Sequence, residues 1–303
     1  MINLDVIKGI MVPIITPVTK EEEIDLPKLD EIIDRCINGG VSGILLFGSN
    51  GEFYMFSEEE MEATLKHVLE YVNGRVPVLF GIGAIRTKTC VRLAKMAERN
   101  KAYGISILQP MFLKLTEQEL TLHFDTIAKA VSKDFPVLLY NNPGRCGYSI
   151  TPNVVETVAK NNENIVGMKD SSGDISLLQE FLRRTKFKPF KIFGGKDTLV
   201  YASLCVGADG GVCSIAQVMP EETVRIYKEF AAGNIAAARE AQEFINPIRL
   251  SQDKASFPVA TKVMCNMVGL EVGDSVRPSL PSPEPVVSLF EKELTAAGIL
   301  PKK

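Results

Sequence analysis

Short apolar runs alternate with helical patterns along most of this chain. Between the runs, apolar residues recur every three or four positions, as Leu29, Ile32, Ile33 and Cys36 do, and this spacing is typical of amphipathic helices. A run that is apolar at every position is typical of a strand buried on both faces, as in a parallel sheet. The alternation therefore predicts a parallel sheet covered by helices. The runs occupy residues 9–15, 43–47, 77–80, 104–108, 136–140, 165–168, 190–193 and 210–212.

Eight such strand and helix units predict a closed barrel. A doubly wound open sheet is the alternative, but it would usually carry a glycine-rich fingerprint after its first strand. Here the first run leads into Thr16-Pro17 instead. We therefore predict an α/β fold, a (β/α)8 TIM barrel with extra C-terminal helices, because eight units of about this total length form such barrels. The catalytic barrel would occupy residues 1–233, and a C-terminal helical extension packed on it would occupy residues 234–303.

Local signals mark where several helices begin. Ser57 and Glu60 form a capping-box pattern, in which each side chain satisfies a free backbone N–H group. Thr116 and Glu119 form a second pattern of this kind. Thr151, which precedes a proline, predicts the start of another helix.

The charge and the cysteine content exclude several classes of protein. The formal net charge is −3 and the basic residues are dispersed, so we expect no nucleic-acid-binding face. The apolar runs stay far below the ~20 residues of a membrane span, so we expect no membrane partner. The six cysteines include no CxxC pair, and the first residues do not resemble a signal peptide. This pattern predicts a reduced, cytoplasmic location.

Barrel enzymes carry their active sites at the C-terminal ends of the strands. Metal chemistry is poorly supported, because His67 and His123 lie inside helical patterns and no pair has ligand spacing. A Ser-His-Asp triad is unsupported for the same reason, and residues 48–51 are one residue short of a nucleophile elbow. The strand ends hold Thr16, Ser49, Asn50, Tyr140, Lys169, Asp170 and the segments 110–112 and 194–197.

Lys169 is the candidate nucleophile among these positions. Burial lowers the pKa of an amine, and a neutral amine can form a Schiff base with a ketone. Tyr140 ends the preceding strand, so the phenol and the amine would emerge side by side. Two simpler interpretations stay open at this point. Lys169 could form a structural ion pair with Asp170, and Tyr140 could only pack and hydrogen-bond.

Four short motifs resemble the dihydrodipicolinate synthase / N-acetylneuraminate lyase family in order and approximate spacing. Together they span nearly the whole chain, and their combination is specific although each motif alone is weak. The segment 207–214 also looks like the family's last strand. The motifs are Gly9-x-x-x-Pro13-x-x-Thr16-Pro17, Gly48-Ser49-Asn50-Gly51-Glu52, Tyr140-Asn141-x-Pro143 and Gly167-Met168-Lys169-Asp170-Ser171.

The resemblance implies a role for each matching residue. Lys169 would form a covalent Schiff base with pyruvate, so no cofactor is expected. Tyr140 would relay protons, which carbinolamine dehydration and C–C bond formation or cleavage both require. Ser49 would offer its hydroxyl, and Asn50 its backbone N–H, to the pyruvate carboxylate. Cys213, in the last-strand segment, is a further substrate-binding candidate.

Other positions bear on the branch of the family. Arg145 matches the arginine that synthase members use for the carboxylate of aspartate semialdehyde, and a guanidinium suits that task because it binds carboxylates with two hydrogen bonds. A solvent-facing arginine is the alternative. The usual tyrosine pair of the synthases is here Met111-Phe112. Phe112 has no hydroxyl for a proton relay into a neighbouring subunit, but it could pack across a subunit interface. The resemblance also implies a homotetramer, a dimer of dimers.

Three positions argue against feedback by lysine. Lysine-inhibited synthases carry His, Asn and Glu where this chain has Glu58, Ile85 and Thr89. We therefore expect no inhibition by lysine.

We predict a Schiff-base-forming, pyruvate-dependent lyase or aldolase. It would condense pyruvate with a small aldehyde, or release pyruvate from a 2-keto acid, as a synthase-like member of this family. The sequence Gly-Ser-Asn-Gly-Glu is similar to other branches, which leaves three alternatives. These are a 4-hydroxy-2-oxoglutarate aldolase, a 2-keto-3-deoxy sugar acid aldolase and an N-acetylneuraminate lyase-like enzyme. Two other classes remain: a barrel isomerase that binds phosphate at residues 207–211, and a non-catalytic keto-acid sensor.

Overall fold

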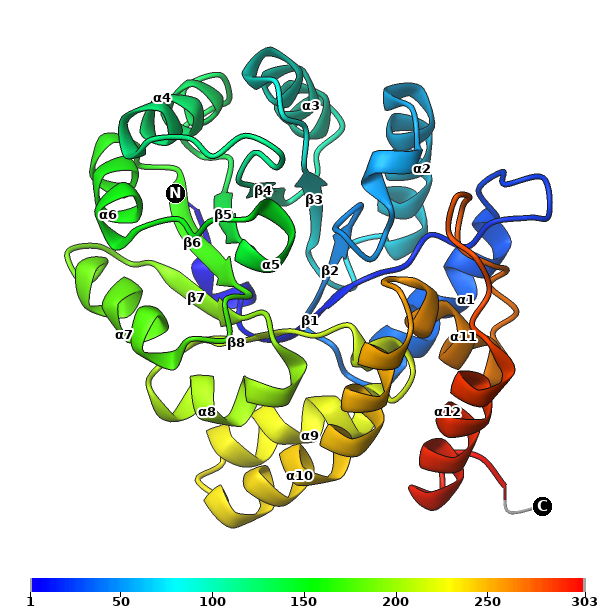
Figure 1. Cartoon of the computed structure of the whole chain (residues 1–303). Coiled ribbons are helices and arrows are strands. Elements are labelled where there is room, and N and C mark those ends of the chain that lie inside the picture. Colours follow the sequence, from blue (N-terminus) through cyan, green and yellow to red (C-terminus); the bar gives the residue numbers. More distant parts are fainter. Residues whose placement is uncertain (1, 302–303) are drawn as a thin grey trace.

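Eight parallel strands close into a barrel in the computed structural model, which describes residues 2–301 (Figure 1). Each strand pairs with the next one along the chain, and β8 pairs with β1 to close the sheet. The predicted (β/α)8 barrel is therefore confirmed, and the open sheet is excluded. The strands are β1 Gly9–Pro13, β2 Gly43–Leu46, β3 Val78–Ile82, β4 Gly104–Leu108, β5 Val137–Asn141, β6 Ile165–Asp170, β7 Lys191–Gly194 and β8 Gly210–Val212.

Helices surround the barrel and continue past its last strand (Figure 1). Those of the barrel are α1 Leu26–Asn38, α2 Glu58–Val72, α3 Thr87–Arg99, α4 Glu117–Ala128, α5 Pro143–Cys146, α6 Pro152–Asn161, α7 Ile175–Arg184, α8 Val200–Cys205 and α9 Pro220–Ala231. The C-terminal ones are α10 Ile235–Ser251, α11 Val259–Met267 and α12 Glu284–Ala296. Short 3-10 turns lie at η1 Leu4–Val6, η2 Phe53–Met55, η3 Asp197–Leu199, η4 Ile215–Gln217 and η5 Gln252–Lys254.

The helix starts that the sequence predicts are confirmed. Ser57 and Thr116 each accept a hydrogen bond from a backbone N–H three residues on, and the glutamates there complete both capping boxes. Thr151 caps α6 through its side chain. These ends could be predicted because a cap needs only neighbouring residues.

Several predicted boundaries differ from the observed ones. β1 ends at Pro13 rather than at residue 15, and β3 continues to Ile82. β6 extends through Lys169 and Asp170, because both residues find ladder partners on β5 and β7. β5 continues to Asn141, and the segment after it contains the single helical turn α5. A proline at the first position of this turn favours its helical start.

Two apolar cores leave room for a site at only one end of the barrel. One core fills the interior, and Met11, Leu45, Leu138 and Phe193 belong to it. The other lies between the strands and the surrounding helices. Leu4, in η1, packs against the interior core. These apolar side chains fill the interior of the barrel. The polar residues at the C-terminal ends of the strands therefore have space only at that end of the barrel.

The C-terminal helices pack on the outside of the barrel (Figure 1). α10 packs along α9, and α12 packs against α10. The chain then returns to the barrel, where the Val18 N–H donates to the Val272 carbonyl oxygen over 3.1 Å. The division of the chain at residue 233 stays a prediction. No helix in the described part of the chain is long and apolar enough to cross a membrane.

Candidate active site

Lys169 and Tyr140 lie side by side inside the barrel. They are register partners on β6 and β5, so their side chains leave the sheet on the same face. The Lys169 Nζ atom lies 4.4 Å from the centroid of the Tyr140 ring. Each residue is only 6% exposed. The two groups that the sequence places at neighbouring strand ends therefore meet in a buried site.

The Tyr140 phenol is surrounded by hydrogen-bonding groups. The Asn142 side-chain amide donates to its hydroxyl oxygen over 2.9 Å, and the side chains of Ser49 and Ser171 lie near enough to lower its pKa. Burial alone would raise the pKa of Tyr140. The Lys169 charge and the polar side chains of Ser49, Ser171 and Asn142 outweigh burial, so the pKa of Tyr140 lies below its ordinary value. A phenol in this setting gives up and takes back a proton more easily.

Asp170 has a structural role and leaves Lys169 unpaired. Its carboxylate accepts hydrogen bonds from the Asn141 amide and from the Ser172 hydroxyl, each over 2.7 Å. Successive strand residues point to opposite faces of a sheet, so Asp170 faces away from the barrel interior. Lys169 makes no ion pair with Asp170 in residues 2–301. The interpretation that Lys169 forms a structural ion pair with Asp170 is therefore wrong.

The loop after β2 carries Ser49 and Asn50 to the same site. Ser49, Ser106 and Tyr140 line one small cavity. Asn50 is 5% exposed, and its side-chain oxygen has no hydrogen-bond partner among the described residues. The Thr16 hydroxyl donates to the Gly51 carbonyl oxygen over 2.8 Å, which ties the loop to the end of β1.

Cys213 directly follows β8 and is fully buried. Burial, and the Asp197 carboxylate, raise the pKa of its thiol well above the ordinary value, while the Lys169 charge acts in the opposite direction. The thiol is therefore neutral, and it lies close enough to the Lys169 amine to feel its charge. This placement agrees with a binding contact and argues against a reactive thiolate.

Arg145 lies on α5 and is exposed to solvent, and one contact orients its side chain. Its guanidinium carbon lies 4.6 Å from the centroid of the Phe257 ring, a cation–π contact with the segment before α11. Burial raises the pKa of Tyr54, and the Arg145 charge opposes that effect. Arg145 therefore lies near Tyr54, which follows the Ser49–Asn50 loop.

Phe112 projects from the loop after β4. Its side chain is 91% exposed and its backbone φ is +71°. A large ring that exposed in a left-handed conformation is unusual. Within this chain the structure does not bring Phe112 to Lys169 and Tyr140.

The sequence missed Asn142 and Ser171 as neighbours of the Tyr140 hydroxyl. Both immediately follow strand ends that carry candidate residues. Each lies two positions after a candidate residue, Tyr140 or Lys169, and just beyond the end of that residue's strand. That spacing was the available signal.

The histidines take no part in the site. His67 pairs with Asp30 over 2.9 Å between α2 and α1. His123 is buried against Thr87, and burial lowers its pKa to about 4. Residues 2–301 contain no cluster of three or more side chains suited to a metal ion. Both histidines are packing residues, as the helical patterns predict.

Residues 207–211 lack the features of a phosphate site. They lead into β8 and so lie toward its N-terminal end, away from Lys169. The N–H groups of Gly207, Ala208 and Asp209 already donate to carbonyl oxygens within the chain. A phosphate-binding turn needs free N–H groups.

The barrel with its buried lysine and tyrosine defines a lyase of the class I aldolase type. The model of the dihydrodipicolinate synthetase family matches residues 6–297. The chain belongs to this family, so the resemblance in its motifs is confirmed.

Relatives and solved structures agree with this assignment. The chain is 30% identical to a 4-hydroxy-tetrahydrodipicolinate synthase of Thermotoga neapolitana, over 97% of this chain and 99% of the relative. The crystal structure of dihydrodipicolinate synthase from Thermotoga maritima is similar, with a TM-score of 0.93 and 28% identity over 97% and 99% of the two chains. A prophage protein of the same family from E. coli K12, solved in complex with pyruvate, gives a TM-score of 0.91 and 27% identity over 97% and 99%.

Proposed function

We propose that the protein forms a Schiff base between Lys169 and pyruvate and uses it to make or break a carbon–carbon bond with a small aldehyde. The buried Lys169 amine over the Tyr140 ring carries this proposal. A relative of the same family was solved in complex with pyruvate, which supports the choice of ketone.

The proposed reaction begins when the neutral Lys169 amine attacks the ketone carbon of pyruvate. Tyr140 passes a proton to the oxygen, water leaves, and a protonated Schiff base remains. This cation withdraws electrons, so the methyl group loses a proton and becomes an enamine. The enamine carbon attacks the aldehyde, whose oxygen takes up a proton, and water then releases the product from Lys169. The reverse sequence cleaves a 4-hydroxy-2-keto acid.

Three further residues would hold pyruvate in place. The Ser49 hydroxyl and the Asn50 backbone N–H would bind its carboxylate, and the neutral Cys213 thiol would line the other side. Ser49 lines the same small cavity as Tyr140 and lowers the pKa of its phenol, so one hydroxyl would link the carboxylate site to the proton relay. The mechanism requires no separate cofactor.

Arg145 would bind the carboxylate of the second substrate. Its contact with Phe257 holds the guanidinium at the rim, where it can bind a carboxylate with two hydrogen bonds. An aldehyde with a carboxylate, such as aspartate semialdehyde, fits this position. With this role for Arg145, the protein would be a synthase-like member of the family.

A second candidate function is an aldolase that releases pyruvate from a 4-hydroxy-2-keto acid. Two observations favour it: the buried, unpartnered Asn50 amide oxygen, which could accept from a substrate hydroxyl, and the missing hydroxyl at Phe112. The branches with 4-hydroxy-2-oxoglutarate, keto-deoxy sugar acids or N-acetylneuraminate as substrates all remain in this group.

Phe112 would contact a second copy of the chain in a cytoplasmic homotetramer. An aromatic ring that is 91% exposed is typical of an interface position. Replacing it with a charge, Phe112→Glu, should dissociate the interface, which sedimentation would detect as a smaller particle.

Borohydride reduction tests the proposal directly. Incubation with pyruvate and borohydride should inactivate the enzyme and leave one covalent adduct, which peptide mass spectrometry should map to Lys169. A keto-acid sensor would bind pyruvate without an adduct. No adduct, or an adduct on another lysine, would disprove the proposed chemistry. A panel of aldehydes with pyruvate, run in both directions, then separates the synthase from the aldolase.

A further inference from the structure

A fully buried ion pair joins the Ser49–Asn50 loop to the C-terminal helices. Glu52, which ends the loop, is 0% exposed, and Lys262, on α11, is 1% exposed. The Lys262 Nζ atom lies 2.8 Å from Glu52 Oε2. Glu52 follows β2, whereas Lys262 lies in the C-terminal helices after the barrel.

Both charged groups also hold the backbone of a third segment, residues 272–276, which we term the return segment. Lys262 Nζ donates to the Asp274 carbonyl oxygen over 2.9 Å. Glu52 Oε1 accepts from the Val276 N–H over 3.1 Å. The loop, α11 and the return segment therefore converge on one carboxylate and one ammonium group.

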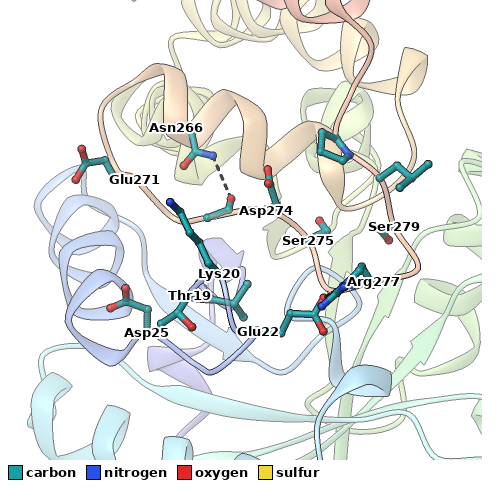
Figure 2. A pocket seen from close by; sticks show the side chains of 14 residues that line it. Thr19, Lys20, Glu22, Asp25, Asn266, Glu271, Asp274, Ser275, Arg277 and Ser279 are labelled. Carbon is teal, nitrogen blue, oxygen red and sulfur yellow. Dashed lines mark hydrogen bonds and ion pairs between the residues drawn. The ribbon is translucent and has the colours of Figure 1, made fainter.

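The outer side of the return segment is open. A surface pocket of about 780 Å³ lies on this side. Figure 2 shows Asp274 and Ser275 on one side of this pocket and Lys20 and Glu22 on the other. On this side Asn266 holds the segment, because its amide donates to the Gly273 carbonyl oxygen over 3.1 Å and accepts from the Val272 N–H over 2.6 Å. The Glu52–Lys262 pair supports it from within.

Glu52 needs such an anchor because of its backbone. Its φ of 51° and ψ of 38° are left-handed, a conformation that residues other than glycine persist in only when their surroundings impose it. The Glu52 N–H in turn donates to the Ser49 carbonyl oxygen over 3.4 Å. A shift of Glu52 would therefore move Ser49 relative to Tyr140.

A buried ion pair is a poor device for stability alone, since apolar residues of similar size often do as well. A buried pair can instead select one geometry. We propose that Glu52 and Lys262 are positioning residues that hold the Ser49–Asn50 loop in place for the pyruvate carboxylate, which makes α11 a working part of the active site. This inference rests on the proposed function.

Lys262 does not compete with Lys169 as a nucleophile. Its amine is enclosed, paired with Glu52 and hydrogen-bonded to a carbonyl oxygen. A ketone cannot approach it. The borohydride adduct should therefore be absent from Lys262.

The test compares Lys262→Met with a control variant, Lys188→Met, that removes a similarly placed lysine far from the site. Lys188 is also partly buried and donates to the carbonyl oxygens of Ala159 and Asn162, each over 2.8 Å, but it precedes β7 at the opposite end of the barrel. Lys262→Met should raise the KM for pyruvate about 10- to 100-fold, as expected for a displaced binding group. It should leave the KM for the second substrate nearly unchanged. Lys188→Met should lower the melting temperature without changing either KM.

A double-mutant cycle with Ser49→Ala tests the route of the effect. If Lys262 acts by placing Ser49, the Lys262→Met change should have much less effect on the pyruvate KM in the Ser49→Ala background. Additive effects, or a pyruvate KM that changes no more than in Lys188→Met, would overturn the inference.

A second variant covers the case in which Lys262→Met does not fold. Glu52→Gln combined with Lys262→Met leaves no unpaired buried charge and should recover stability. We expect its pyruvate KM to stay raised. Recovery of both stability and pyruvate KM would also overturn the inference. The wild-type borohydride adduct at Lys169 is the separate check, because its absence would reject the proposed function itself.

Discussion

The centre and the rim of the candidate site are built differently. Lys169 and Tyr140 are buried on adjacent strands, and the barrel ladder fixes them. Arg145 lies on a single helical turn, and Phe112 on an exposed loop. Groups on strands hold a geometry with little freedom, whereas loops at this end of a barrel can vary without disturbing it. The centre should therefore set the reaction, and the rim should select the second substrate.

The largest effect should come from the centre, through Lys169→Met. Loss of the nucleophile should reduce kcat/KM at least about 1,000-fold and remove the borohydride adduct. Lys196, an exposed lysine just beyond β7, provides the control. Lys196→Met should keep the adduct. An adduct that persists in Lys169→Met would remove the basis for placing the chemistry in the centre.

Tyr140→Phe should have the next largest effect, because it keeps the ring beside Lys169 but removes the proton relay. We expect kcat to fall by about 100- to 10,000-fold. The adduct should still form, although more slowly. Stopped-flow and single-turnover measurements would check this, and an unchanged kcat would show that another group moves the proton.

Arg145 tests the rim. Arg145→Ala should raise the KM for a carboxylate-bearing aldehyde about 10- to 100-fold, because the guanidinium would no longer pair with the carboxylate. Pyruvate trapping should stay intact, and an equal loss of trapping would contradict the division between centre and rim. Phe257→Ala should raise the same KM only about threefold, as expected for the loss of one cation–π contact.

Asn142→Ala should change the pH dependence more than the maximal rate. Asn142 donates to the Tyr140 hydroxyl oxygen, which favours the ionised phenol and lowers its pKa. Removing this donor raises the pKa of Tyr140. The limb of the kcat/KM profile that belongs to Tyr140 should therefore move to higher pH, and a limb that moves to lower pH would contradict this assignment.

Lysine should have no effect. Glu58 already pairs with Arg92, and Ile85 offers no polar group to an amino acid. Initial rates should be the same with and without lysine up to millimolar concentrations. Inhibition below a millimolar would mean that an effector site exists without the usual residues.

The barrel could be predicted from sequence because each signal for it is local. Continuous apolar runs identify the strands, and capping residues such as Ser57 and Thr116 identify helix starts. Lys169 and Tyr140 could be found because a strand end fixes where a side chain emerges. The resemblance in the motifs supplied their roles, which position alone left open.

Contacts between distant segments could not be read in this way. Phe257 lies more than a hundred residues from Arg145, and nothing in either local sequence indicates their stacking. The Glu52–Lys262 pair is equally hidden, since Lys262 sits in an ordinary helical pattern. Partners of this kind are set by the closure of the whole barrel and the return of the chain over it.

The Glu52–Lys262 pair also has a consequence for the order in which the protein matures. Lys262 follows Glu52 by about 210 residues. At the usual rate of synthesis, Lys262 is therefore added about 10 to 40 seconds after Glu52. In that interval β8 can emerge and the barrel can close, but the Ser49–Asn50 loop still lacks its anchor. A chain released early, without α11, would bury an unpaired charge beside the substrate site. Such a fragment should therefore be inactive and short-lived, and catalytic competence would appear only at the end of translation.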